Sequence, residues 1–389
     1  MSNTGSLNPS AEDVALPSAA RVAADDMRDR PEDWPLLAPW VAECGRIVGP
    51  VYEKANAAAL VHQRKHRLLT KIAATSGTIA VVLVILELIC MVAGLDTSDK
   101  VLGAFEVVAA LAALLAVVLG LVASQLDNWL VERHKAERCR LMKFGFLIDP
   151  ALWRADQQRT SDRARQLRDE AAGVEAVRTI EEPRRWLGEV HRPAFLTELT
   201  DCRADEPVLR QLIAYYRATR LRVQIAYLDE RIKRFALRDR ITRVLPEWLF
   251  FFSVFAAFVH FALRLWNGPH PLGAPLDAAL VAVLFPALVA AILPVLGAGI
   301  RTYRMANEFG RNVRRFESTL HVLREIDRLL EGVDAKRGFR TDVGVLHRPM
   351  TEEGMDAKTV FLTLWTCEHT LEIEHREWLR LMAETEWFG

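Results

Sequence analysis

The chain contains 389 residues, enough for two or three modules, and 51% of them are hydrophobic. Its 50 basic and 50 acidic side chains cancel, so overall charge gives no argument for a nucleic-acid partner, and we set that class aside. The cysteines are scattered without a CxxC pair, which argues against a disulfide scaffold or zinc module and favours a cytoplasmic location for the polar parts. The five are Cys44, Cys90, Cys139, Cys202 and Cys367.

Residues 1–33 form a tail rich in Ser, Asn, Pro, Ala and Asp, without an aromatic residue. This composition predicts a disordered segment with no signal peptide, so membrane insertion would depend on internal segments. A helical region begins at Trp34. We expect Pro50 in the first turn of a helix that continues through Lys71 into an apolar run, because proline is tolerated in the first turn.

Two apolar runs follow, 72–94 and 101–125, separated by a short polar link. The first run has 23 residues. As a helix it would be roughly 34 Å long, which exceeds a hydrocarbon core of about 30 Å. Each run carries one charge, Glu87 in the first and Glu106 in the second. Buried helices rarely stay apolar on every face for so long, so the pattern predicts a transmembrane hairpin.

Basic residues flank this hairpin on both sides, whereas its link contains two Asp and one Lys. The positive-inside rule therefore places both ends of the hairpin in the cytoplasm. The basic side chains of the lead-in and of the exit helix are expected to lie at an anionic inner leaflet. These predicted membrane-surface residues are Arg64, Lys65, Arg67, Lys71, Arg133 and Lys135.

Residues 150–205 form a polar connector, with one helix expected at 156–182 between prolines. Beyond Pro207, apolar residues alternate by fours and threes over three heptads, which is typical of a helix that packs along a narrow seam. The partner is either another helix of the same bundle or a second chain in a coiled coil. The seam residues are Ala214, Ala218, Leu221, Ile225, Leu228, Ile232 and Phe235.

A second apolar block consists of the runs 245–266 and 278–300, joined by a link of turn-forming residues. Trp266 and a matching tryptophan near the start of the first run predict anchoring at the two membrane interfaces. Arg301 and Arg304 follow the block and extend the predicted basic flank. The second hairpin should therefore have the orientation of the first.

The exit helix of the second hairpin is expected to run from Ala306 to about residue 330. It carries a second seam with the same spacing, and a Gly- and Pro-containing stretch, 332–354, separates it from a last helix, 355–387. The residues of this second seam are Phe309, Val313, Phe316, Leu320 and Leu323.

The two hairpins repeat one plan of basic lead-in helix, span, outer link, span and basic exit helix. An offset of 171 aligns Glu137 with Glu308, from which we infer an internal duplication. The expected organisation is a tail (1–33), a first two-span unit (34–149), the connector (150–205), a second two-span unit (206–331) and a C-terminal loop and helix (332–389).

This arrangement resembles the SLATT family, bacterial two-transmembrane domains associated with SMODS nucleotidyltransferases and SLOG nucleotide-binding domains. The resemblance is carried by the lead-in 62–71 and exit helix 129–138 of the first hairpin, by 227–234 and 303–315 around the second, and by the ending 374–382. It implies a membrane effector of a conflict or antiviral defence system, which oligomerises and forms a pore or perturbs the membrane. The implied trigger is cytoplasmic and nucleotide-linked. The chain has no GxGxxG or GxxxxGK[ST] motif, so a separate protein would have to sense the nucleotide.

Glu87 is the first candidate for an ion pathway, because an ionisable side chain inside a span is costly and suggests a function. Glu106 lies at similar depth on the adjacent helix. In an oligomer the two carboxylates could form an acidic ring that selects cations, or share a proton. The alternatives are a protonated Glu87 bonded to a neighbouring helix and a wet Glu106 near the surface. His260, four residues before Arg264 in the third span, is either a further pathway residue or a packed neutral histidine.

The fourth span contains Pro286 and Pro294, followed by Gly297, and these residues are candidates for a gate hinge or for a static kink. No metal site is expected, because the pair His62 and His66 lies among arginines and lysines without an HExxH glutamate. His369 and His375 with Cys367 were the other combination considered, and no metal is expected there either. No catalytic constellation or cofactor motif is present, so we do not expect an enzyme.

The sequence thus predicts an all-α integral protein of the bacterial inner membrane. It would have four spans, long cytoplasmic helices and both termini in the cytoplasm. Its expected partners are lipids and further copies of the same chain. The competing function is a membrane-anchored scaffold, in which the hairpins hold a cytoplasmic helical bundle at the membrane without conducting.

Overall fold

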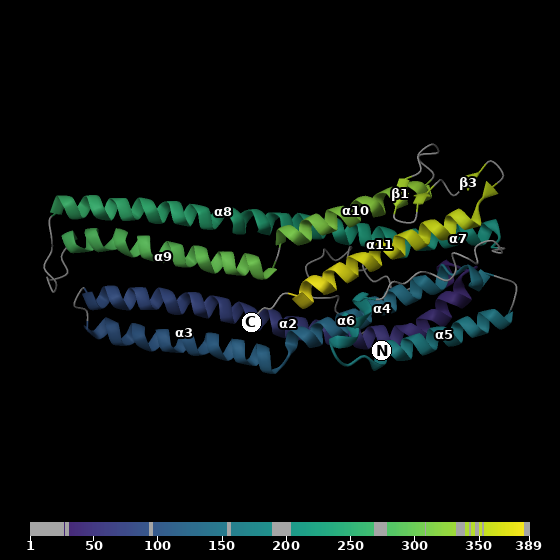
Figure 1. Ribbon diagram of the computed structural model, residues 1–389, viewed down its shortest axis with the longest axis horizontal. Coiled ribbons are helices and arrows are strands. Elements are labelled where there is room, and N and C mark those ends of the chain that lie inside the picture. Colours follow the sequence, from purple (N-terminus) through teal and green to yellow (C-terminus); the bar gives the residue numbers. More distant parts are fainter. Residues whose placement is uncertain are drawn as a thin grey trace, which may run out of the picture. The chain divides into compact units, whose positions relative to one another are not determined.

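The structure, a computed structural model, describes Met27 and residues 31–92, 96–153, 157–188, 204–267, 278–307, 309–331, 339–341, 344–346, 350–351 and 354–384. Helices dominate these residues (Figure 1). Most of the tail predicted to be disordered lies outside them. The helices are α2 (Ala38–Val92), α3 (Asp96–Val122), α4 (Gln125–Leu147), α5 (Gln157–Ala176), α6 (Glu181–Gly188), α7 (Glu206–Tyr216), α8 (Arg222–Asn267), α9 (Ala278–Asn307), α10 (Phe309–Glu331) and α11 (Ala357–Glu384).

The chain forms two compact units that cut across the two halves expected from the sequence. The hairpin unit contains residues 65–125, 233–313 and 387–389. The bundle unit contains residues 1–64, 126–232 and 314–386. Each unit therefore draws on both halves of the chain. The division follows composition, because the long apolar segments collect in one unit and the charged helices in the other.

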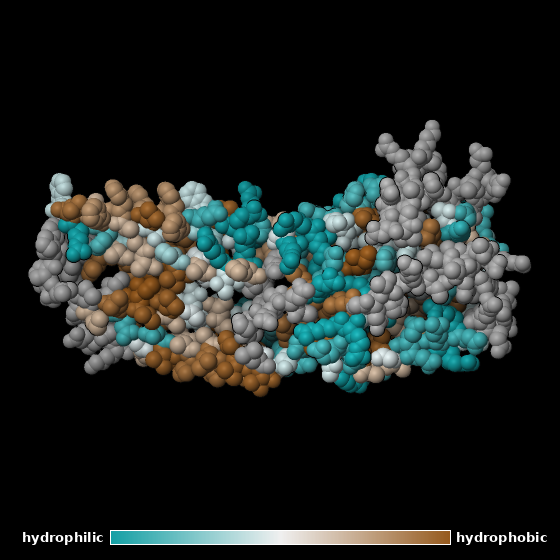
Figure 2. All heavy atoms as spheres, viewed as in Figure 1, coloured by the Kyte–Doolittle hydropathy of each residue, from teal (hydrophilic) through white to brown (hydrophobic). Residues whose placement is uncertain are grey.

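Four helical stretches are long and apolar enough to cross a membrane, as the sequence predicts. Only 6% to 11% of the residues in their most apolar windows are buried. Figure 2 shows hydrophobic side chains on the surface of the hairpins formed by α2 with α3 and by α8 with α9. Such a surface is unfavourable in water by about 25 cal/mol per Å² and is accommodated by lipid. The fold therefore indicates a membrane protein.

The first long helix begins earlier than predicted. α2 starts at Ala38, so Pro50 lies inside the helix and not in its first turn. The prediction from proline position was wrong because it relied on the missing N–H alone. The two glycines just before this proline, Gly45 and Gly49, have open space where a side chain would be, so the chain is not crowded there.

The exit helices α4 and α10 have equal lengths of 23 residues. α4 begins at Gln125 and α10 at Phe309, an offset of 184. Glu308, which aligns with Glu137 at the predicted offset of 171, lies outside the described residues, so the internal duplication stays a prediction. α3 and α4 are separated by a bend in which Ser124 adopts φ 43°, a left-handed conformation that is uncommon for residues other than glycine.

A π turn between α7 and α8, Arg217–Leu221, changes which residues face the bundle. Ala214 and Ala218, predicted in the seam, are exposed, whereas Tyr215 and Tyr216 are buried. A π turn adds residues to one turn of helix and so shifts the phase of a heptad pattern. The seam prediction was therefore wrong at Ala214 and Ala218, whereas Leu221 at the end of the turn is buried as predicted. In the second seam, on α10, four of the five predicted residues are buried: Phe309, Phe316, Leu320 and Leu323.

The connector contributes two helices to the bundle unit, α5 and α6, where the sequence predicted one at 156–182. The chain between residues 332 and 356 adds two short antiparallel hairpins that the all-α prediction did not include. β1 (Phe339–Thr341) pairs with β2 (Gly344–Leu346), and β3 (Met350–Thr351) pairs with β4 (Gly354–Met355). The last helix, α11, begins two residues later than expected, at Ala357.

Candidate functional sites

Glu87 on α2 lies with its carboxylate against α3. A Cβ built on Gly103 would stand 3.2 Å from Glu87 Oε1 and 3.6 Å from Glu87 Cδ. The missing side chain of Gly103 therefore provides the space that the carboxylate occupies. Glu87 is half-buried. The only acid of the first predicted span thus faces the second helix of its own hairpin.

Glu106 lies one turn after Gly103 on α3. Residues three apart share a helix face, so Glu106 and the glycine that receives Glu87 are on the same side of α3. Glu106 is also half-buried. The structure thus brings the two predicted carboxylates to neighbouring turns of one hairpin. Gly103 was missed from the sequence, because a glycine in an apolar run gives no signal of what it faces.

His260 and Arg264 lie on α8 as predicted. His260 is half-buried and Arg264 is exposed near the end of the helix. This position fits a side chain that snorkels, in which the aliphatic stem lies along the span and the guanidinium reaches the membrane surface.

The candidate hinge residues lie within one continuous helix, α9, which includes both Pro286 and Pro294. Gly297 is buried, and a Cβ built on it would lie 3.7 Å from Cα and O of Pro246 in α8. The Ser253 hydroxyl donates to the carbonyl of Ala290 at 2.7 Å, which adds a second link between α8 and α9. Gly297 therefore lies at a close contact between α8 and α9.

Gly299 joins the two hairpins inside the hairpin unit. A Cβ on Gly299 would lie 2.7 Å from Oγ1 of Thr78 on α2, closer than any real contact. The Thr78 hydroxyl donates to the Ala74 carbonyl at 2.8 Å and is thus held in place. Gly297, two residues earlier, was predicted as a hinge candidate, whereas this contact between the hairpins has no signal in the sequence.

Replacing Gly299 with valine is expected to destabilise the hairpin unit by about 1–3 kcal/mol, the usual cost of overpacking. Thr78→Ala in the same chain should recover at least half of that loss, because it removes the hydroxyl and methyl that the new side chain meets. Thermal unfolding of the full chain in detergent micelles measures both effects. Equal melting temperatures for the single and double variants would contradict this contact.

The predicted basic flanks divide into exposed and buried residues. Arg64, Lys65, Arg67 and Lys71 are exposed, as a membrane-surface role requires. Arg133 and Lys135 are not: the Lys135 side chain is 7% exposed and Arg133 is half-buried. Lys135 lies 2.7 Å from Glu132, so its expected place at the lipid surface was wrong. Arg301 is exposed, and the position of Arg304 is described below.

Arg133 belongs to a charged group around Glu137 in the bundle unit. The carboxylate lies 2.7 Å from both Arg133 and Arg140. Arg140 also donates to the Tyr52 hydroxyl at 2.8 Å, which ties α4 to α2. Burial alone would raise the pKa of Glu137, but Arg140 and Arg133 outweigh it and hold the pKa well below its usual range. Glu137 is therefore a structural anion that organises α4.

A second ion pair, between Arg220 and Glu368, is fully buried. Arg220 lies in the π turn and donates through Nε and Nη2 to the two carboxylate oxygens of Glu368 on α11, at 3.0 and 3.1 Å. The Tyr216 hydroxyl donates to the same carboxylate at 2.6 Å. The guanidinium also lies over the Phe144 ring, 4.8 Å from its centre. The pair connects α4, the π turn and α11 with its polar groups satisfied.

Two histidines from distant parts of the chain meet in the same unit. His134 Nδ1 on α4 lies 3.3 Å from His375 Nε2 on α11, and both side chains are buried. Their rings stack, with centres 5.5 Å apart, and Trp186 on α6 packs against both. One imidazole must donate and the other accept in this contact, so it requires at least one neutral ring.

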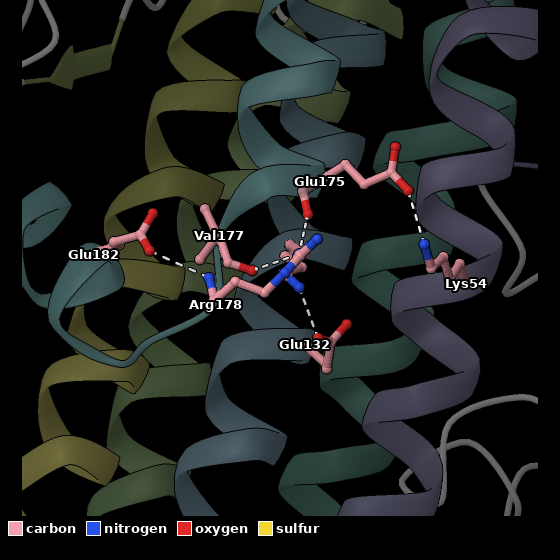
Figure 3. Close-up of polar contacts among 7 residues, drawn as sticks. Lys54, Glu132, Glu175, Val177, Arg178 and Glu182 are labelled. Atoms are coloured by element: carbon pink, nitrogen blue, oxygen red, sulfur yellow. Dashed lines mark hydrogen bonds and ion pairs between the residues drawn. The ribbon is translucent and has the colours of Figure 1, made fainter.

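Further ion pairs on the exposed side of the bundle unit join neighbouring helices (Figure 3). Lys54 on α2 lies 2.8 Å from Glu175 on α5. The backbone amide of Arg178 donates to the Glu182 carboxylate at 3.2 Å. The guanidinium of Arg178 donates to the Val177 carbonyl at 3.1 Å. These contacts fix the turn between α5 and α6. Exposed pairs of this kind contribute at most about 1 kcal/mol each.

The bundle unit offers little reactive chemistry in its described residues. Burial raises the pKa of Cys139 and of Cys367 to about 12, so both remain protonated thiols. His375 pairs with His134 and not with Cys367 or His369. No group of three or more His, Cys, Asp or Glu side chains in the described ranges could hold a metal ion.

These features define a helical protein with four candidate membrane spans and a polar bundle held by buried ion pairs. Comparisons with protein-family models, with curated proteins and with solved structures find no match to this chain. The resemblance to the SLATT family therefore rests on the sequence patterns alone.

Proposed function

We propose that this chain is a SLATT-like membrane effector that oligomerises in the bacterial inner membrane and opens a path for cations. The observation that carries the proposal is the placement of Glu87 against Gly103, one turn from Glu106, in a hairpin whose other surface is apolar. A charged group in a span costs about 2.5 kcal/mol or more, so its retention favours a role in ion passage. Copies of this hairpin around an axis would line a path with carboxylates.

The bundle unit would control this path through the continuous helices. α2 and α8 each pass from one unit to the other without a break. A change in packing around the π turn or around the buried ion pairs can therefore alter the tilt or rotation of the spans. The trigger in this proposal comes from a separate, nucleotide-sensing protein that contacts the cytoplasmic bundle. Pro286, Pro294 and Gly297 are the residues at which α9 would bend.

The proposal predicts that Glu87→Gln lowers the preference for cations over anions. Removing one charge at about 4 Å from a passing ion costs about 1 kcal/mol even in water-like surroundings. This corresponds to about fivefold in the permeability ratio. The measurement is the reversal potential of purified protein in planar bilayers under a salt gradient. Glu53→Gln, on an exposed part of the same helix in the bundle unit, is the matched control and should leave the ratio unchanged.

The membrane-anchored scaffold is the competing function, and the same preparation distinguishes it. Liposomes loaded with a dye should leak when the purified protein, in its wild-type or a triggered form, is reconstituted into them. If neither the wild-type protein nor a triggered form releases dye or carries current, conduction is refuted and the scaffold is favoured. Unchanged selectivity in Glu87→Gln with normal current would remove Glu87 from the pathway.

A further inference from the structure

Asp239 on α8 is buried and holds two arginines of the hairpin unit. Arg304 on α9 lies with Nη2 3.1 Å and Nε 3.2 Å from Asp239 Oδ1. Arg243, one turn further along α8, donates to Oδ2 of the same carboxylate. A Cβ built on Gly310 would come within 3.1 Å of Asp239 Oδ1, so a side chain there would crowd the carboxylate. One buried anion thus positions two guanidinium groups from two helices.

The two arginines lie at the same predicted boundary of the membrane. Arg243 precedes the apolar run 245–266, and Arg304 follows the run 278–300. Both runs belong to one hairpin, so the start of the first run and the end of the second run lie at the same membrane surface. After Arg243, α8 carries Trp248 and further exposed apolar residues into the predicted span. The pair therefore stands at the level of lipid headgroups and not in the bundle unit.

The charge at this level is unbalanced in favour of cations. A single carboxylate faces two guanidinium groups, of which the Arg243 side chain is 57% and the Arg304 side chain 37% exposed. Arg238, Arg240 and Arg301 nearby in sequence are also exposed, whereas Glu247 is the one exposed acid among the described residues 238–247 and 301–307. Guanidinium groups held in fixed positions match the oxygens of a phosphate by paired hydrogen bonds.

Apolar side chains beside the arginines distinguish a lipid from a free phosphate. Phe250 and Val254 on α8 are exposed at 60% and 53%. They follow Arg243 by seven and eleven residues, so they lie on the same face of the helix, further into the predicted span. An acyl chain can lie against them while the phosphate meets the guanidinium groups. We propose that Asp239, Arg243 and Arg304 form a site for the phosphodiester headgroup of an anionic phospholipid. This site is independent of the proposed conduction and would serve a scaffold equally.

The test uses the full chain in detergent micelles and a fluorescent phosphatidylglycerol, with a phosphatidylcholine bearing the same label for comparison. Wild-type protein is expected to bind the anionic lipid in preference. Arg243→Gln with Arg304→Gln should reduce that preference about thirtyfold, since each arginine contributes at the membrane surface. Arg324→Gln, an exposed arginine of α10 paired with Asp229, is the matched control and should keep it.

A buried Asp239 without its arginines could unfold the protein, so Asp239→Asn is combined with both glutamine substitutions in a third variant. This variant has no unpaired charge, and it should fold and lack the preference. Equal binding of both lipids by the wild type, or an undiminished preference in the triple variant, overturns the site. Displacement of the labelled lipid by inorganic phosphate as effectively as by unlabelled phosphatidylglycerol would also overturn it, because the acyl contacts would then contribute nothing.

Discussion

Replacing Glu368 with alanine is expected to destabilise the protein by about 3–5 kcal/mol, because it leaves a buried guanidinium without its counter-ion. Arg220 is 2% exposed, and Glu368 accepts hydrogen bonds from its Nε and Nη2. The Tyr216 hydroxyl would lose its acceptor as well. The free energy of unfolding of the full chain in detergent, followed by circular dichroism during urea titration, measures this loss.

The matched control is an exposed pair of the same bundle unit, Arg324 with Asp229, which are 3.0 Å apart. Asp229→Ala should change the free energy of unfolding by about 1 kcal/mol or less. A third variant, Arg220→Met with Glu368→Leu, replaces both charges by apolar groups of similar size. Such replacements are often neutral or stabilising. A loss in the double variant as large as that of Glu368→Ala would show that the charge imbalance is not the cause.

The second large effect is a loss of stability on acidification between pH 6.5 and 4. Burial, with arginines nearby, lowers the pKa of His375 to about 4, and burial with the charge of His375 lowers the pKa of His134 well below 6.5. Both rings are therefore neutral in the folded protein and take up protons in the unfolded chain below pH 6.5. Stability is complete above that pH and falls as pH decreases, by about 1.4 kcal/mol per pH unit for each histidine.

Between pH 6.5 and 5 this amounts to about 2 kcal/mol for each ring. Four arginines, Arg133, Arg138, Arg315 and Arg376, oppose protonation of the pair, whereas Glu137 favours it. His375→Phe should remove about a third of the pH dependence, and His134→Phe with His375→Phe about two thirds, because Phe keeps the aromatic contacts. Buried His66, whose pKa burial lowers to about 4, would contribute the rest. Urea midpoints at pH 7, 6 and 5 provide the comparison. An identical pH dependence in the double variant would exclude the histidine pair as its origin.

The apolar helices could be predicted from the sequence because length and uninterrupted hydropathy are local properties. The runs 72–94 and 278–300 needed no knowledge of their neighbours. The exit helix α10 and its seam could be predicted for the same reason. Helix starts were harder to predict. Pro50 suggested the beginning of a helix, but α2 starts at Ala38 and continues through this proline.

Charge alone could not distinguish a surface from a core. Arg133 and Lys135 follow an apolar run, as membrane-surface residues do, yet both are paired in the bundle unit. Arg301 has the same sequence context and is exposed. The partner acids, Glu137 and Glu132, lie four and three residues away on the same helix, a spacing that the sequence does show. The difference depends on whether other helices of the bundle unit cover that part of the chain.

The sequence by itself determined that two apolar hairpins alternate with charged helices, because hydrophobic length and charge act through each residue's own transfer energy. Tertiary structure decided everything that depends on an opposing surface. It placed Gly103 against Glu87 and Gly299 against Thr78, and it brought His134 to His375 across 241 positions of the chain. It also placed Arg220 in the core through one π turn. These contacts join residues far apart in sequence, so no local pattern encodes them.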